Sequence, residues 1–432
     1  MTDSREVHIN VPVMARVEGE GALALTIRDG RIDTLKLQIF EPPRLFEKFL
    51  EGRDYEEVPD IVARICGICP VAYQMSAVHA LESVFGIPID GWVRDMRRVL
   101  YCGEWIESHA LHIHLLAAPD FLGFPNAIAM AEQHADIVRR GLRLQALGNR
   151  LMHLFGGRSV HPVGVRVGGF HHAPSPEEVA TVVNELRAAL PEAEALVYWT
   201  ASLDLPDDEQ SFTCVALRHP GEYPMNQGRL VSSGGLDIDI ENFDSHFIEL
   251  HVPHSTALHA LLDGRPYLVG PLARINLNCD RLPESVRRVI AATGVRFPSR
   301  NMFHSVIARA VEVLYALIEA IRLLQNYALP KRPFVPVTPR AGSGTGCTEA
   351  PRGILWHRYT LNGEGFIRSA RIVPPTSQNQ ARIEEDLRVS LEAYGLERNE
   401  QELRLRGETV IRNYDPCISC STHFLRIHVD RQ

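Results

Sequence analysis

The chain has 432 residues, of which 45% are hydrophobic and 23% are charged, and its 53 acidic and 45 basic residues give a formal net charge of −8. This composition is typical of a folded globular protein and excludes a disordered or fibrous chain. The mild negative charge argues against non-specific binding of nucleic acid or of an anionic membrane surface as the main activity.

The N-terminal region predicts a β-hairpin. Apolar side chains alternate with polar ones along residues 21–39, on both sides of the pair Asp29-Gly30. That pair tolerates the positive φ angles of a tight hairpin turn. The residues before it contain no positively charged segment followed by an apolar one, so we predict no secretory signal.

The middle of the chain predicts long helices. Apolar residues recur at three- and four-residue spacing along residues 93–118, 127–155 and 302–327, which is the period of an amphipathic helix. The most apolar stretch, residues 310–324, contains two glutamates and is shorter than the roughly 20 apolar residues that cross a bilayer. We therefore expect no membrane span and a cytoplasmic protein.

A further helix start is marked by capping chemistry. Ser175 offers a hydroxyl cap, Pro176 occupies the first helical position and Glu178 completes a capping box. We expect this helix to end near Leu190. Between residues 205 and 290 the pattern changes to short β-like runs with Gly and Pro, which indicates a smaller α+β lobe.

These elements predict an α+β fold that is predominantly α-helical, with a central bundle of long helices, an N-terminal β-hairpin and the smaller lobe. We interpret the chain, residues 1–432, as one unit without a clear linker. Its expected parts are a β-rich segment (1–60), a helical core (61–204), the α+β lobe (205–290) and a second helical part (291–432). A Walker A motif is missing from the sequence, and the glycines of residues 342–346 lack the spacing of a dinucleotide fingerprint, so we expect no nucleotide site on this chain.

Four of the eight cysteines form two CxxC pairs, Cys66 with Cys69 and Cys417 with Cys420, near opposite ends of the chain. This spacing lets both sulfurs of a pair meet one ion, and four thiolates favour zinc, nickel or iron-sulfur centres. Pro70 predicts that a helix starts beside Cys69. The N-terminus of a helix carries a partial positive charge, which favours the thiolate form of this cysteine. The residues alone also allow a structural zinc site or a redox role for one pair, although the two pairs of a zinc ribbon lie about 15–20 residues apart.

The surroundings of the pairs, residues 64–70 and 415–423, closely resemble the two signature motifs of the large, catalytic subunit of nickel-iron hydrogenases. Within this family, the residues around the first pair look most like those of the cytoplasmic bidirectional, NAD(P)-linked or sulfhydrogenase-type branch. The other blocks that match the family, in order along almost the whole chain, are Arg16 to Gly19, Arg44 to Glu47 with Gly52 to Asp54, His161-Pro162 with Gly168-Gly169, Glu349 to Gly353, and Pro375-Thr376 ahead of Asn379.

The resemblance implies reversible, heterolytic cleavage of dihydrogen at a nickel-iron centre whose iron carries carbonyl and cyanide ligands. Cys66 and Cys417 would bind nickel terminally, and Cys69 and Cys420 would bridge nickel to iron. Glu18 matches the glutamate that takes a proton from a terminal thiolate, here Cys417, which is a general acid-base role.

Other residues acquire roles by the same resemblance. Arg352 matches a guanidinium held over the open side of the centre, where a fixed positive charge is favourable. Thr376, after Pro375, matches a hydroxyl that hydrogen-bonds a cyanide ligand. The ligands of a second site, usually magnesium, are matched by Glu47, the backbone carbonyl of Ile372 and His423; oxygen ligands suit that hard ion.

The remaining cysteines are scattered and form no iron-sulfur ligand set: Cys102, Cys214, Cys279 and Cys347. The resemblance therefore implies an iron-sulfur small subunit as partner, with further flavin and NAD(P) reductase subunits beyond it. The chain also continues from Phe424 to Gln432, where many relatives are cleaved after nickel insertion. It is therefore either a precursor, with a maturation protease as a further partner, or a member of a branch that keeps this tail. Tyr73 stands where many relatives have histidine, and the role of that histidine is not transferred.

Three alternatives stay open on the sequence. A dihydrogen-sensing regulatory subunit would share the site, and a structural-zinc scaffold would share the cysteines. The quinone-side subunit of respiratory complexes shares the fold but has generally lost the metal cysteines, all four of which are present here.

Overall fold

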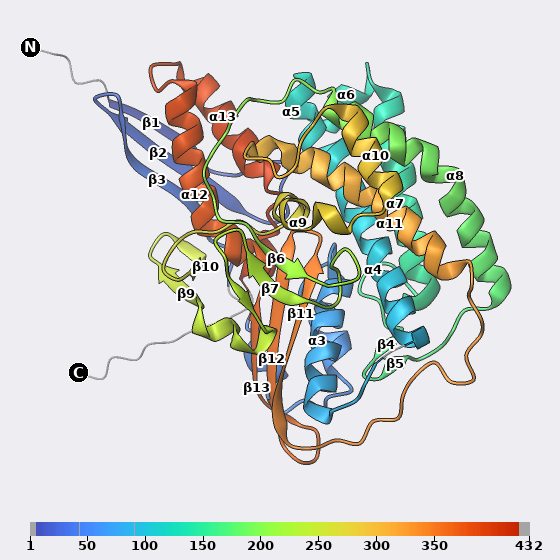
Figure 1. Cartoon of the computed structure of the whole chain (residues 1–432). Coiled ribbons are helices and arrows are strands. Elements are labelled where there is room, and N and C mark those ends of the chain that lie inside the picture. Colours follow the sequence, from blue (N-terminus) through green and yellow to red (C-terminus); the bar gives the residue numbers. More distant parts are fainter. Residues whose placement is uncertain (1–5, 43, 90, 423–432) are drawn as a thin grey trace, which may run out of the picture.

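The computed structural model describes residues 6–42, 44–89 and 91–422. The fold is mixed α+β with helices predominating, as predicted (Figure 1). Within these ranges, no helix is both long enough and apolar enough to cross a membrane.

The predicted hairpin is confirmed. Strands β2 (Gly21–Arg28) and β3 (Arg31–Ile39) pair antiparallel, and both residues of the turn between them, Asp29 and Gly30, have positive φ. A further strand, β1 (Glu6–Val11), pairs with β2. Helices α12 (Pro375–Tyr394) and α13 (Glu400–Asn413) pack on this sheet, so the two ends of the sequence share one apolar core (Figure 1).

A second layer consists of helix α3 (Pro70–Phe85) on the antiparallel strands β11 (Gly342–Ala350), β12 (Gly353–Leu361) and β13 (Ile367–Val373). The glycine run of residues 342–346 lies in β11, and its purpose here is close packing. A Cβ atom added at Gly346 would lie 2.1 Å from the carbonyl oxygen of Ser76, and one added at Gly344 would lie 2.4 Å from that of Ala80. The run therefore lets α3 lie directly on the strand.

This close approach gives a stability prediction. Gly346→Ala should lower the midpoint of thermal unfolding, because the new methyl group meets backbone that cannot rotate away; overpacking of this kind costs about 1–3 kcal/mol. Gly363→Ala is the matched control, since a Cβ added there meets nothing within 4 Å. Equal midpoints for the two variants, measured by calorimetry, would contradict the packing argument.

The long helices form a bundle. Its members are α4 (Gly91–Leu111), α7 (Ala135–Gly156), α8 (Pro176–Ala201) and α11 (Ser305–Leu324). Helix α4 continues as a π-helical turn, η1 (His112–Ala117), and then α5 (Ala118–Leu122). The single helix expected over 127–155 is wrong: α6 (Ala127–Ala131) ends in a turn, and His134 leaves helical geometry before α7 begins.

Helix α8 starts with the predicted capping box at Ser175 but does not end near Leu190. It continues for more than two turns past Pro191. Pro191 lacks the N–H that would bond the carbonyl of Arg187, and both residues are exposed, so water can satisfy that carbonyl. Beyond Pro191 the side chains of Ala193, Leu196 and Val197 are buried in the apolar cluster that also contains the buried residues of α11.

The segment for which a smaller lobe was predicted, residues 205–290, contains short elements. Two small antiparallel sheets are formed, one by β6 (Val215–Arg218), β7 (Arg229–Ser232) and β8 (Asp237–Ile238), the other by β9 (Phe247–Val252) and β10 (Ser255–Leu262). Helices α9 (Pro271–Asn278) and α10 (Glu284–Thr293) follow. The remaining short α-helices and strands are α1 (Phe46–Leu50), α2 (Val58–Val62), β4 (Val165–Arg166), β5 (Gly169–Phe170) and α14 (Ile418–Ser421). Three short 3-10 helices are η2 (Ile240–Ser245), η3 (Cys279–Arg281) and η4 (Met302–His304).

Candidate metal centre

The four CxxC cysteines meet in the interior. Cys66 and Cys417, which are 351 positions apart in sequence, have their sulfur atoms 3.5 Å apart. The sulfurs of Cys69 and Cys420 are 3.7 Å apart, and those of Cys417 and Cys420 are 2.7 Å apart. Each residue is at most 3% exposed, and none forms a disulfide. Four buried thiols that converge on one point form a soft ligand set for a metal centre.

Local geometry holds the first pair. Cys69 is the N-cap residue of α3, as predicted from Pro70. The backbone N–H groups of Ile68 and Cys69 donate to the sulfur of Cys66, at 3.3 and 3.2 Å. The buried Glu104 of α4 accepts hydrogen bonds from the first N–H groups of α3, which fixes the direction of this helix.

The second pair is held by the N-terminal segment. Glu18 forms an isolated parallel bridge with Cys417, and its carbonyl accepts from the N–H of Ile418 at 3.0 Å. Its carboxylate oxygen Oε2 accepts from the N–H of Ser419 at 3.0 Å and lies 3.1 Å from the sulfur of Cys417. Glu18 is half-buried, so this carboxylate links the thiol cluster with the outside of the molecule.

Arg44 joins the two pairs. Its guanidinium donates to the backbone carbonyl of Ile65 at 2.6 Å and also to that of Ser419. Ile65 precedes Cys66, and Ser419 lies between the second pair of cysteines. The sequence analysis placed Arg44 in a block that matches the family but gave it no role. Its role in joining the two loops depends on which backbone carbonyls the fold brings within reach of the guanidinium, and the sequence does not show this.

Arg352 is fixed by Asp415. The guanidinium Nε donates to the Asp415 carbonyl at 2.6 Å, and Nη2 pairs with its carboxylate at 3.0 Å. Burial disfavours the charge, but Asp415 and the cluster thiols more than offset this and raise the pKa of Arg352 well above its ordinary value. Nη1 is buried without a hydrogen-bond partner among the described residues. Asp415 was missed as a site residue, although it stands two positions before Cys417.

The buried thiols differ in acidity. Burial raises the pKa values of the Cys417 and Cys420 thiols. At Cys66 burial also opposes ionisation, but hydrogen bonds from the other three thiols, with the charge of Arg352, hold the pKa well below its ordinary value. Only a cation among the sulfurs could stabilise four thiolates in so small a volume, so the donor set fits a bound metal.

Thr376 lies in the first turn of α12, after Pro375, and both residues are buried. Its hydroxyl oxygen accepts a hydrogen bond from the Cys417 N–H at 3.1 Å. The hydroxyl proton therefore remains available to a second acceptor.

Tyr73 is completely buried near the cluster, and its hydroxyl has no hydrogen-bond partner among the described residues. Its ring lies 5.7 Å from the ring of His357. Burial, and then the charge of the nearby cysteines, raise the pKa of Tyr73 well above its ordinary value, so this residue stays protonated at neutral pH.

Of the three residues predicted to hold a second metal, the structure describes Glu47 and Ile372. The Glu47 carboxylate accepts from the Ile372 N–H at 2.7 Å, so this carboxylate lies beside β13. His423 is outside the described residues. Its neighbour Thr422 accepts from the N–H of Arg44 at 2.6 Å, which brings that part of the chain close to the segment carrying Glu47.

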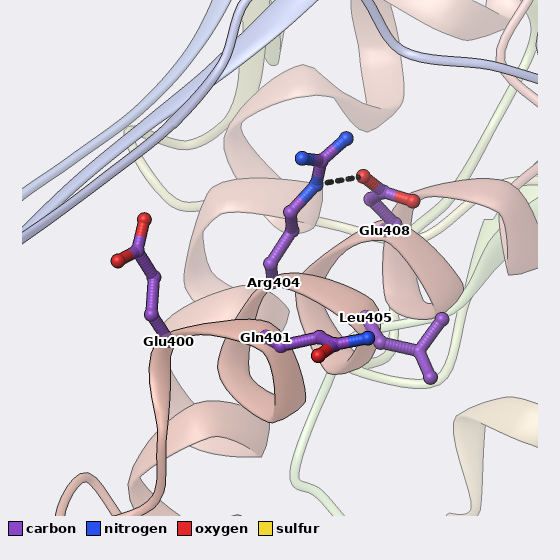
Figure 2. A pocket seen from close by; sticks show the side chains of 5 residues that line it. All are labelled: Glu400, Gln401, Arg404, Leu405 and Glu408. Carbon is purple, nitrogen blue, oxygen red and sulfur yellow. Dashed lines mark hydrogen bonds and ion pairs between the residues drawn. The ribbon is translucent and has the colours of Figure 1, made fainter.

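A surface hollow lies over one face of α13 and is lined by Glu400, Gln401, Arg404, Leu405 and Glu408. Figure 2 shows the Arg404 guanidinium paired with Glu408. The lining contains no thiol, imidazole or buried polar group, so it does not compete with the cysteine cluster as the reactive site.

The sequence matches the family model described as nickel-dependent hydrogenase, over residues 44–143 and 258–423. The chain is 33% identical to sulfhydrogenase 2 subunit alpha of Pyrococcus furiosus over 97% of its length and 100% of that protein. It is 34% identical to sulfhydrogenase 1 subunit alpha of the same organism, over 97% and 98% of the two chains. A crystal structure of an NAD+-reducing [NiFe]-hydrogenase in the H2-reduced state superposes with a TM-score of 0.86 at 27% identity, covering 97% of this chain and 99% of the other.

Proposed function

The chain belongs to the nickel-iron hydrogenase large-subunit family and is an oxidoreductase that acts on dihydrogen, and from this we propose that it cleaves dihydrogen reversibly and heterolytically, passing electrons to an iron-sulfur partner and on to NAD(P). The observation that carries the proposal is the buried set of four thiols with one carboxylate against it. The quinone-side alternative is not favoured, since that branch has generally lost these cysteines.

The donor set supports the assignment of ligands. Thiolates are soft ligands that suit nickel and iron, and we assign Cys66 and Cys417 as terminal and Cys69 and Cys420 as bridging ligands. When bound, a nickel-iron centre with carbonyl and cyanide on iron supplies the heterolytic splitting of dihydrogen. The chain itself excludes bulk water, because each cysteine is at most 3% exposed.

Proton movement is assigned to Glu18. Its Oε2 lies 3.1 Å from the Cys417 sulfur, within the reach of direct transfer between the two groups. The N–H of Ser419 holds the same oxygen in place. Because Glu18 is only half-buried, a proton received there can continue toward solvent.

Arg352 and Thr376 are assigned to orientation. The pair with Asp415 fixes the Arg352 guanidinium, so its positive charge is preorganised beside the thiols. We assign the hydroxyl proton of Thr376 to a cyanide ligand, because the oxygen is already used by the Cys417 N–H. Pro375 would position that turn.

We also propose a magnesium ion held by Glu47, the Ile372 carbonyl and His423. Support comes from the contact between Glu47 and the Ile372 backbone and from the bond between Arg44 and Thr422. Magnesium accepts carboxylate and carbonyl oxygens and usually keeps several waters. Its role would be to tie the C-terminal segment to the body of the subunit.

Elemental analysis tests the proposal most directly. We expect nickel and iron at about one each per chain in matured protein, with thiolate sulfur bound to nickel by X-ray absorption. Zinc in place of nickel at the sulfur ligands would favour the structural-zinc alternative. A dihydrogen sensor would contain the same metals, but it would bind a signalling partner and turn over slowly with a dye acceptor.

Electron exit from this chain requires a partner. The described residues contain no second group of three or more cysteines, and Cys102, Cys214 and Cys347 are separately buried. We therefore propose an iron-sulfur small subunit, followed by flavin- and NAD(P)-binding subunits, in a cytoplasmic complex. Nickel insertion would be followed by a maturation protease acting after His423.

This proposal predicts that the isolated subunit does not reduce NAD(P) with dihydrogen, because electrons have no route to the nucleotide. The measurement compares NAD(P)H formation by the pure chain and by the reconstituted complex. Comparable rates from the two samples would refute the need for a partner, whereas recovery of the rate on adding the partners agrees with it.

A further inference from the structure

Three potential metal ligands gather where the β9–β10 hairpin meets α12. They are His254, in the turn between the strands, His259 in β10 and Glu384 in α12, and their ligand atoms all lie within 4.8 Å of one another. Nε2 of His254 is 2.8 Å from Oε1 of Glu384. The same carboxylate oxygen accepts from the N–H of Leu37 in β3 at 2.9 Å, which holds it in position.

His259 is the unusual member. It is 5% exposed, and its ring lies at 87° to the His254 ring with the centroids 5.7 Å apart. Its Nε2 is buried and has no hydrogen-bond partner among the described residues. Buried polar atoms are rarely left without a partner.

We propose that His254, His259 and Glu384 bind a divalent cation of the zinc type, at a site separate from the cysteine cluster. Two imidazole nitrogens and one carboxylate oxygen are ligands that zinc uses at tetrahedral sites, with water in the fourth position. The side chains of His254 and Glu384 are 18% and 20% exposed, so water can reach that position. Magnesium and calcium are disfavoured, because they prefer oxygen ligands.

The ion would act as a brace. It would connect the β9–β10 hairpin to α12, which carries Thr376 in its first turn, and Glu384 already bonds β3. Thr256 of the same hairpin donates to the carbonyls of Ile39 and Glu41, so the two regions already touch. This inference does not depend on the chemistry assigned to the cysteines.

The test uses matured protein loaded with nickel and iron, so that the cysteine cluster is already filled. Titration with zinc chloride in a calorimeter should show one zinc per chain, and zinc-edge X-ray absorption should show nitrogen and oxygen neighbours at about 2.0–2.1 Å, not sulfur at about 2.3 Å. Glu384→Gln and His254→Gln should each weaken zinc binding at least tenfold, because losing a ligand should cost at least as much as losing a hydrogen-bond partner of a ligand, which costs about 10–100-fold.

Glu384→Gln keeps an oxygen that can accept from Leu37 and His254, so it should fold normally even if the buried His259→Gln variant does not. The matched control is His251→Gln, at an exposed position of β9, which should bind zinc like the parent. The proposal is overturned if the parent binds no zinc, if the bound zinc has sulfur neighbours, or if Glu384→Gln and His254→Gln bind as tightly as the parent.

Discussion

Cys417→Ser should abolish dihydrogen turnover and the retention of nickel while the chain stays folded. The residue is central to the cluster, since its sulfur lies 2.7 Å from that of Cys420 and 3.5 Å from that of Cys66. A serine hydroxyl is a harder and much less acidic ligand than a thiol, so it should not hold nickel. The fold should survive, because stability comes mainly from the apolar core.

The measurements are nickel and iron content, exchange between deuterium gas and water, and circular dichroism. Cys66→Ser should behave in the same way. Cys214→Ser is the matched control, because Cys214 is equally buried but lies outside the cluster and contacts Asn276. Full nickel content and turnover in Cys417→Ser would overturn the ligand assignment.

Glu18→Gln should lower turnover and deuterium exchange together by tenfold or more while nickel and iron stay near parent levels. Glutamine keeps an oxygen to accept from Ser419 and has almost the same shape, but it cannot carry a proton at neutral pH. A tenfold loss corresponds to about 1.4 kcal/mol in the limiting barrier.

Two comparison variants separate proton transfer from structure. Glu18→Asp keeps the acid but shortens its reach beyond the present 3.1 Å from Cys417, so its activity should fall between glutamine and parent. Glu20→Gln changes an exposed acid two positions away and should leave exchange unchanged. Parent-level exchange in Glu18→Gln, or equal damage in Glu20→Gln, would refute Glu18 as the first proton acceptor.

Much of the local structure could be predicted because its causes are local. Asp29-Gly30 can adopt positive φ, so the hairpin follows from two residues and the alternation around them. Pro70 and Ser175 begin helices for reasons contained in one turn of chain. Prediction failed at Pro191, because the apolar cluster that buries α8 beyond this residue includes α11, which comes from a distant part of the sequence.

The sequence by itself determined the two CxxC pairs, the start of the helix at Cys69 and the family resemblance, because each depends on short, contiguous motifs. The resemblance implied that all four sulfurs meet, and the tertiary structure confirms it. Only the tertiary structure decided that Arg44 holds both loops and that Asp415 fixes Arg352. The cluster of His254, His259 and Glu384 likewise has no local signature, since Glu384 is 130 positions from His254. Such contacts depend on how separate elements pack in three dimensions, and the spacing of residues along the chain does not encode that packing.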